Sequence, residues 1–257
     1  MLTLLTSKPP NRETAMSSTE RLESWLPFFL LLVGSVLFTA GGSFHPHVGT
    51  AMGVLGSPEF FTNFAQKMVS TPGWIPMHML ILAGPVMWAL AAPSVGQRLP
   101  QGGKSIWAIA QTLLVISATL WIITFVLDGF IAPVYARKLL APRPGGIDPM
   151  MLMNFGMNQT TLVRLGLVSL VMNEFAITLY SSGLIASSRR LSWRTVIGVA
   201  GILIGVWPFI AALSGKFLLS HYLSAFVRTT PSNLSVGLTC AAAASVGAMS
   251  TVRTNSE

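Results

Sequence analysis

Long stretches of apolar residues with almost no charge recur along this chain. Five of them are close to twenty residues or longer, and a sixth, more weakly apolar stretch follows. A helix of about 20 apolar residues crosses the ~30 Å hydrocarbon core of a bilayer. Backbone groups in lipid must be hydrogen-bonded internally, which a helix achieves by itself. The pattern predicts an all-α, polytopic membrane helix bundle with about six spans, at residues 25–44, 74–92, 106–131, 161–186, 196–213 and 234–252.

Two shorter segments have the pattern of interfacial helices on the outer face. Ser57-Pro58-Glu59 is a typical helix start. Apolar residues then recur at helical spacing, so residues 58–70 are predicted to form an amphipathic helix lying on the membrane surface. Residues 217–227 repeat this pattern in a segment that is too short to cross the bilayer. The apolar residues of the first segment are Phe60, Phe61, Phe64 and Met68.

Composition supports a membrane protein and argues against nucleic-acid binding. The chain is 52% hydrophobic and 9% charged, whereas soluble domains carry about 25% charged residues. Its net charge of +8 comes from Lys and Arg residues that lie mostly between the apolar runs. In such loops, basic residues determine the orientation of the spans and interact with anionic lipid headgroups. No pattern of interleaved basic and aromatic residues indicates nucleic acid. The expected partners are the lipid bilayer and a possible small-molecule ligand, and the oligomeric state stays open.

The distribution of Lys and Arg predicts the orientation. Alternate loops hold nine of these residues on one side and six on the other, leaving out Arg164 within a span. The excess predicts that both termini are cytoplasmic. The expected organisation is a disordered cytoplasmic tail at 1–24, one transmembrane helical domain at 25–252 and a short tail at 253–257. Translation could also start at Met16.

The start of the second span, Trp74-x-x-x-His78, looks like that of short polytopic bacterial membrane proteins. This likeness implies a bacterial inner membrane, and it carries over no activity and no site residues.

All four histidines fall on the face predicted to lie outside. They are His45, His47, His78 and His221. Imidazole nitrogens bind zinc, copper and haem iron, so these residues are candidate metal ligands. A bis-histidine haem could take His78 with His45 or His47. The alternative is that histidines at headgroup level only hydrogen-bond to water.

Two charged residues lie at similar predicted depth on consecutive spans. Asp128 is in the last turns of the third span and Arg164 in the first turns of the fourth. Charged residues within spans are costly and usually pair. We therefore expect an Asp128–Arg164 ion pair, which either holds the helices together or binds an anionic or zwitterionic ligand.

Glu174 is the most unusual single residue of the chain. It lies ten residues beyond Arg164, which is about 15 Å deeper at helical rise. An acid at that depth is a candidate for a proton pathway. The alternative is a hydrogen-bonded acid that fixes helix contacts, since Asn173 is adjacent and Thr178 and Ser181 share its helix face.

No nucleotide-binding or serine-hydrolase motif is present. The polar residues instead favour small-molecule or proton-coupled transport through an outward-facing pocket, with Asp128, Arg164 and Glu174 on the ligand or proton pathway. One alternative is a membrane-embedded redox enzyme with metal or haem at the histidines. Another is a non-catalytic accessory subunit. Whether the protein is an enzyme, and which cofactor it carries, stay open.

Overall fold

The computed structural model describes residues 18–45, 52–54, 56–97, 104–186, 195–196, 198–203 and 206. Within these residues every regular element is a helix, which confirms the all-α prediction. The elements are α1 (Ser18–Phe44), α2 (Pro58–Ser70), α3 (Trp74–Gln97), α4 (Lys104–Val126), the π-helix η3 (Leu127–Ile131), α5 (Ala132–Leu140) and α6 (Pro149–Ala186).

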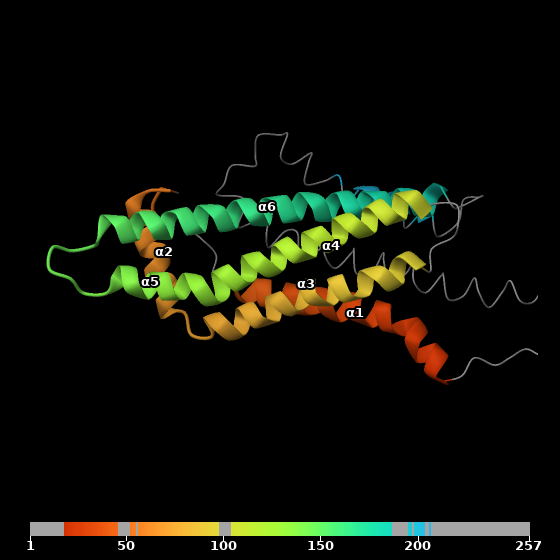
Figure 1. The fold of residues 1–257 in the computed structure, drawn as a ribbon, viewed down its shortest axis with the longest axis horizontal. Helices are drawn as coiled ribbons and strands as arrows, with labels where there is room; N and C mark the ends of the chain where they lie inside the picture. The colour runs from red at the N-terminus through yellow and green to blue at the C-terminus, as the bar shows by residue number, and fades with distance from the viewer. Residues whose placement is uncertain are drawn as a thin grey trace, which may run out of the picture.

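The long helices α1, α3, α4 and α6 lie side by side along the molecule, as Figure 1 shows. Helix α1 packs on α3, α3 on α4, and α4 on α6. We call the end that carries α2, α5 and the turn at 141–148 the hairpin end. The structure thus contains four helices that are long and apolar enough to cross a membrane, at Trp25–Phe44, Trp74–Pro93, Ser105–Leu140 and Pro149–Gly183.

Close packing of α1 on α3 depends on glycine. A Cβ atom added to Gly84 would lie 2.7 Å from the carbonyl oxygen of Gly34. Small residues at such positions let helix backbones approach closely, which is how helices associate in membranes. The buried indole of Trp88 donates a hydrogen bond to the Ser35 hydroxyl at 3.3 Å. Together these contacts fix the register of the two helices.

The segment between the third and fourth predicted spans differs from the sequence prediction. Residues 132–160 were expected to form a connection, but α5 continues α4 through η3, and α6 begins at Pro149. Asp148 caps α6, since its Oδ1 accepts a hydrogen bond from the Met150 amide at 2.8 Å. Its Oδ2 also pairs with Arg143 at 2.8 Å. Asp148-Pro149 is a typical helix start in the sequence. The basic residues nearby indicated a loop instead.

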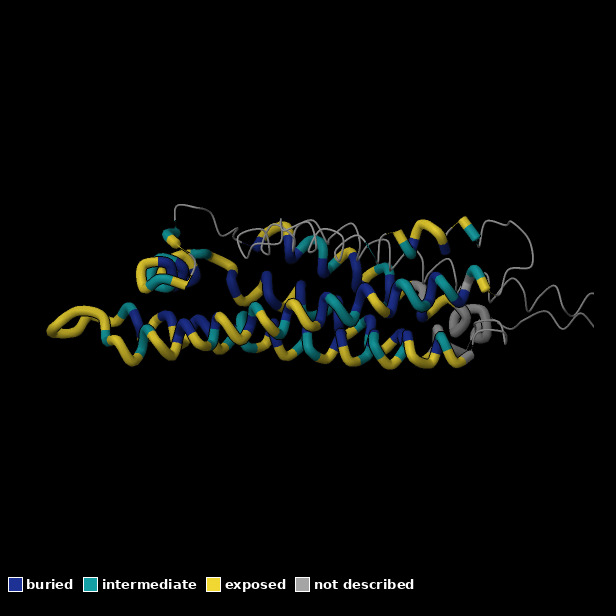
Figure 2. The backbone as a smooth tube through the Cα atoms, turned by 90° about the horizontal axis from the view of Figure 1, so that it is seen from above, coloured by how far each residue is buried: buried dark blue, intermediate teal, exposed yellow. Residues whose placement is uncertain are grey.

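The resulting hairpin is longer than a bilayer requires. Its two apolar stretches contain 36 and 35 residues, whereas about 20 residues span the hydrocarbon core. The apolar stretch of α1 ends at Phe44 and that of α3 begins at Trp74. The excess length therefore projects at the hairpin end, where Figure 2 shows an exposed turn.

The predicted amphipathic helix at 58–70 is confirmed in its bounds, and the Ser57 hydroxyl caps it by accepting from the Phe60 amide at 3.1 Å. Its apolar face, however, packs on α5 and α6. Phe64 lies 6.4 Å from Phe155 of α6, measured between ring centroids. The expectation that this face lies on lipid is therefore wrong, because the projecting hairpin supplies an apolar surface of its own.

The predicted spans at 196–213 and 234–252, and the segment at 217–227, lie wholly or largely outside the described residues. The count of six spans therefore stays a prediction.

Candidate metal centre at the hairpin end

Three helices bring together His45, His78 and Asp128 at the hairpin end. His45 directly follows α1, His78 lies in the second turn of α3, and Asp128 lies in η3. The Oδ2 atom of Asp128 is 3.0 Å from His78 Nε2 and 3.5 Å from His45 Nε2. The possible ligand atoms of the three side chains all lie within 4.8 Å of one another. Side chains far apart in sequence thus converge on one point.

The ring of His78 is held in one orientation by a backbone group. Its Nδ1 lies 2.8 Å from the carbonyl oxygen of Trp74. A carbonyl oxygen only accepts, so Nδ1 carries a hydrogen and donates it. In the neutral ring Nε2 then has a free lone pair, and this lone pair faces the Asp128 carboxylate at 3.0 Å. Two acceptors at that distance require a cation or a proton between them.

Trp74 supports the cluster in a second way. Its indole Nε1 donates to the backbone oxygen of Asp128 at 3.1 Å. Its ring lies against both imidazoles, with centroid distances of 4.7 Å to His78 and 5.3 Å to His45. One residue therefore orients two of the three polar side chains, as outer partners commonly orient metal ligands.

The π-helix and its glycine bring Asp128 close to His78. A Cβ atom on Gly129 would lie 2.5 Å from the Cβ of His78, so no larger residue fits while η3 keeps this position. Single π-helical turns within α-helices occur frequently at functional sites. Here the turn presents Asp128 to the histidines of two other helices.

The cluster is largely closed to solvent. His78 is fully buried and Asp128 keeps 15% of its side chain exposed. The Oδ1 atom of Asp128 is buried and makes no hydrogen bond within the described part of the chain. Burying a carboxylate without compensation is costly. This second oxygen is therefore also available to a bound cation.

Two imidazole nitrogens and a carboxylate form a donor set that suits zinc and ferrous iron. The same geometry does not suit haem between these two histidines. Their rings are 5.2 Å apart at 68° and approach the same carboxylate oxygen, which leaves no space for a porphyrin between them. His47 and His221, the other candidate ligands, lie outside the described residues.

The structure separates Arg164 from this cluster, so the expected Asp128–Arg164 ion pair is wrong. The Ser117 hydroxyl of α4 donates to the Ser169 carbonyl of α6 at 2.8 Å, and this bond sets the register of the two helices. With a helical rise of 1.5 Å per residue counted from the Ser117–Ser169 bond, Asp128 lies about 9 Å nearer the hairpin end than Arg164. The sequence estimate placed both residues at the ends of spans whose true helices are longer.

Glu174 lies still further from the cluster. From the same register it is about 24 Å along the bundle from Asp128. It is fully buried, as are its neighbours Asn173 and Ser181. The Thr178 hydroxyl donates to the backbone oxygen of Glu174 at 2.9 Å rather than to its carboxylate. Glu174 thus belongs to a packed polar interface of α6, and its role on a proton pathway stays a prediction.

Sequence reasoning missed Trp74 and Gly129 as site residues. Trp74 precedes His78 by one helical turn, which is the spacing at which a backbone carbonyl meets a side chain of the next turn. Gly129 directly follows the acid, and a glycine within a helical pattern often has a packing reason. Both patterns are present in the sequence, but neither pattern shows which residues Trp74 and Gly129 contact.

Comparisons with known proteins give no match to this chain among family models, curated proteins or solved structures. The interpretation of the site therefore rests on its own geometry.

Proposed function

We propose that this chain is an integral membrane protein that binds one divalent transition-metal ion at its hairpin end. The ligands are His45 Nε2, His78 Nε2 and the carboxylate of Asp128. The observation that carries the proposal is the convergence of these three side chains, with the His78 lone pair directed at the carboxylate by its bond to Trp74.

The three groups lie close enough together to share one bound ion. His78 Nε2 lies 3.0 Å from Asp128 Oδ2, and His45 Nε2 approaches the same oxygen at 3.5 Å. A divalent ion accepts all three groups at once. Calcium and magnesium prefer oxygen ligands, whereas two imidazoles favour zinc or ferrous iron. The proposed ligand class is therefore a first-row transition metal.

The proposed setting is a bacterial inner membrane with both termini in the cytoplasm. The excess of Lys and Arg in alternate loops supports this orientation. The hairpin end, and the metal centre with it, would then face outward. Residues 25–252 would form a single transmembrane domain.

Direct metal measurement tests the proposal. The full-length protein is purified in detergent, analysed for bound metals, stripped by chelation and titrated with Co²⁺, whose visible absorption reports nitrogen and oxygen ligation. We expect about one ion per chain. His78→Ala and His45→Ala should each weaken binding by at least about 100-fold, because each removes a ligand and not only an outer partner.

Asp148→Asn is the matched control, since Asp148 is an acid at the same end but pairs with Arg143. It should bind metal as the wild type does. Wild-type affinity in both histidine variants, with helix content and monodispersity preserved, would contradict the metal centre.

A second candidate function is proton-coupled or small-molecule transport. One observation favours it, namely a fully buried acid, Glu174, within an apolar helix, since ionisable groups in spans frequently serve transport. Reconstitution into vesicles with a pH-sensitive dye tests this candidate. Proton flux that is lost in Glu174→Gln would support it, and absence of flux in the wild type would count against it.

A further inference from the structure

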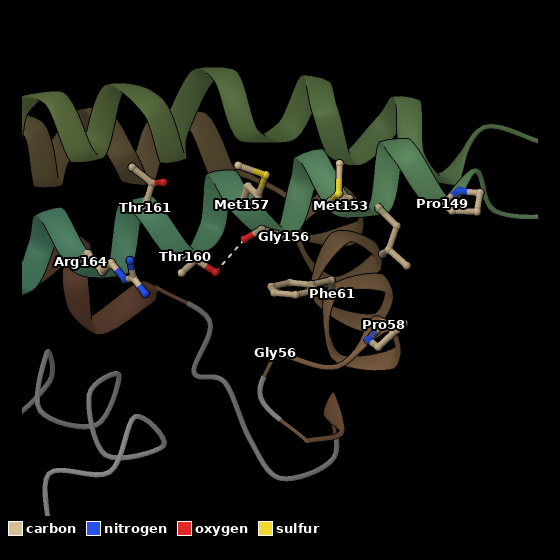
Figure 3. Close-up of a pocket in the computed structure, with 11 residues that line it drawn as sticks. Gly56, Pro58, Phe61, Pro149, Met153, Gly156, Met157, Thr160, Thr161 and Arg164 are labelled. Atoms are coloured by element: carbon tan, nitrogen blue, oxygen red, sulfur yellow. Dashed lines mark hydrogen bonds between the residues drawn. The ribbon is translucent and has the colours of Figure 1, made fainter.

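A groove runs along the hairpin half of α6, separate from the metal centre. Its volume is about 550 Å³. Gly56 and the α2 residues Pro58 and Phe61 form one wall, and α6 from Pro149 to Arg164 forms the other, as Figure 3 shows. None of the three proposed metal ligands lines it.

The groove has one charged end. Arg164 is the sole charged residue among the described residues that line it, and it makes no ion pair within the described part of the chain. The neighbouring Thr160 hydroxyl already donates to the Gly156 carbonyl at 2.8 Å. Arg164 is therefore the charged donor available to an anion at this end.

Beyond Thr160 and Thr161 the groove is apolar and adaptable. Met153 and Met157 are more than half exposed, at 52% and 62%, and thioether side chains fit ligands of varied shape. Phe61 packs directly against Gly156, where an added Cβ would lie 2.8 Å from its ring. From Arg164 to Pro149 the helix advances about 22 Å, which sets the length of this apolar wall.

The direction of the groove identifies the class of ligand. Side chains on a helix tilt toward its N-terminus, so Arg164 extends toward the hairpin end and the apolar wall lies beyond it. A bilayer phospholipid with its phosphate at Arg164 would run its acyl chains the opposite way, toward the middle of the bundle. A single-chain molecule can instead place its anion at Arg164 and its chain along Met157 and Met153.

We propose that this groove binds a single-chain anionic amphiphile, with a carboxylate held by Arg164 and the alkyl chain along α6 toward Pro149. The planar guanidinium matches a carboxylate through two parallel hydrogen bonds. A charged side chain within a span is costly without a partner, and the ligand supplies that partner. The site is independent of the metal centre.

Binding of palmitate and of cetyl alcohol, its uncharged counterpart, tests the proposal. The full-length protein is placed in phosphatidylcholine nanodiscs, and binding of each radiolabelled ligand is measured after subtraction of empty discs. Arg164→Gln should weaken palmitate binding by about 10- to 100-fold, the equivalent of one charged hydrogen-bonded contact. Binding of cetyl alcohol should not change.

Two further variants separate charge from shape. Arg137→Gln removes an exposed base on α5 that does not line the groove, and it should bind both ligands as the wild type does. Met157→Trp fills the groove from an exposed position and should abolish binding of both.

Equal palmitate affinity in wild type and Arg164→Gln would overturn the proposal. Displacement of palmitate by phosphatidylglycerol in the discs would also overturn it, by identifying a phospholipid as the occupant. Metal content, measured on the same samples, should be unchanged in Arg164→Gln, so failure of this site is distinguishable from failure of the metal centre.

Discussion

Asp128 and Glu174, two acids that lie within helices of the described structure, have opposite surroundings. Asp128 faces the lone pair of His78 and approaches a second imidazole, and these groups come from three separate helices. Glu174 lies in a fully buried row on α6 with Asn173 and Ser181. Two imidazoles and a carboxylate that converge from three helices form a donor set that can hold a cation. An acid among hydroxyls and amides is in a setting that supplies donors, so an apolar helix with an acid does not by itself indicate a functional site.

The largest expected difference comes from neutralising each acid without changing its shape. Asp128→Asn should lower metal affinity by at least about 100-fold, because it removes the anionic ligand. Glu174→Gln should leave metal affinity unchanged, since Glu174 lies about 24 Å away. Metal titration of the two variants measures both. Equal losses in the two variants would erase the distinction between the acids.

A substitution that keeps every ligand should also destroy the metal centre. In Gly129→Ala the new Cβ would lie 2.5 Å from the His78 Cβ, and neither atom can move without its backbone. Overpacking of this kind costs about 1–3 kcal/mol and separates Asp128 from His78. We expect lost metal binding and a lowered Tm. Ile131→Ala, at an exposed position of the same π-helix, is the control and should retain metal.

Two buried tryptophans allow a matched test of outer support. Trp74→Phe removes the donor to the Asp128 backbone but keeps the carbonyl that holds His78, and it should weaken metal binding by about 10-fold. Trp88→Phe removes a comparable indole bond to Ser35. Both variants should lose about 1 kcal/mol of stability, but Trp88→Phe should keep full metal affinity. A metal defect in both would mean that general loosening of the bundle is the cause.

The smallest expected effect concerns the interface around Glu174. Ser117→Ala removes the bond between α4 and α6, and such interhelical bonds in membrane proteins average about 0.6 kcal/mol. Thermal unfolding in detergent should show a Tm lower by about 1–3 °C, with unchanged metal binding. Thr112→Ala, which removes an exposed bond within α4, should leave Tm unchanged. A large loss in Ser117→Ala would indicate that this interface has a role beyond packing.

The apolar runs and the helical spacing of apolar residues were sufficient to predict the helical class, the first two long apolar helices and the bounds of the helix at 58–70. These patterns failed where polar residues interrupt a helix, because Arg137 and Lys138 suggested a loop in a segment that is helical. Hydropathy measures preference for lipid, and the helical state of α5 does not depend on that preference.

The metal centre was predicted in part. His45, His78 and Asp128 were each identified as candidates, but Asp128 was assigned to Arg164 because both were placed by counting from span ends. An error of a few residues in a span end moves a side chain by several ångströms along a helix, which exceeds the length of an ion pair. Register between helices depends on contacts such as Ser117 with Ser169, and no periodicity within a single helix reveals those.

All three proposed ligands are encoded in the first half of the chain, before α5 and α6. A ribosome has therefore synthesised the complete set while the second half of the protein is still missing. Metal capture can precede the packing of α4 against α6 during biosynthesis. The ion would then join the first three long helices, α1, α3 and α4, and give the later part of the chain a preassembled surface on which to fold.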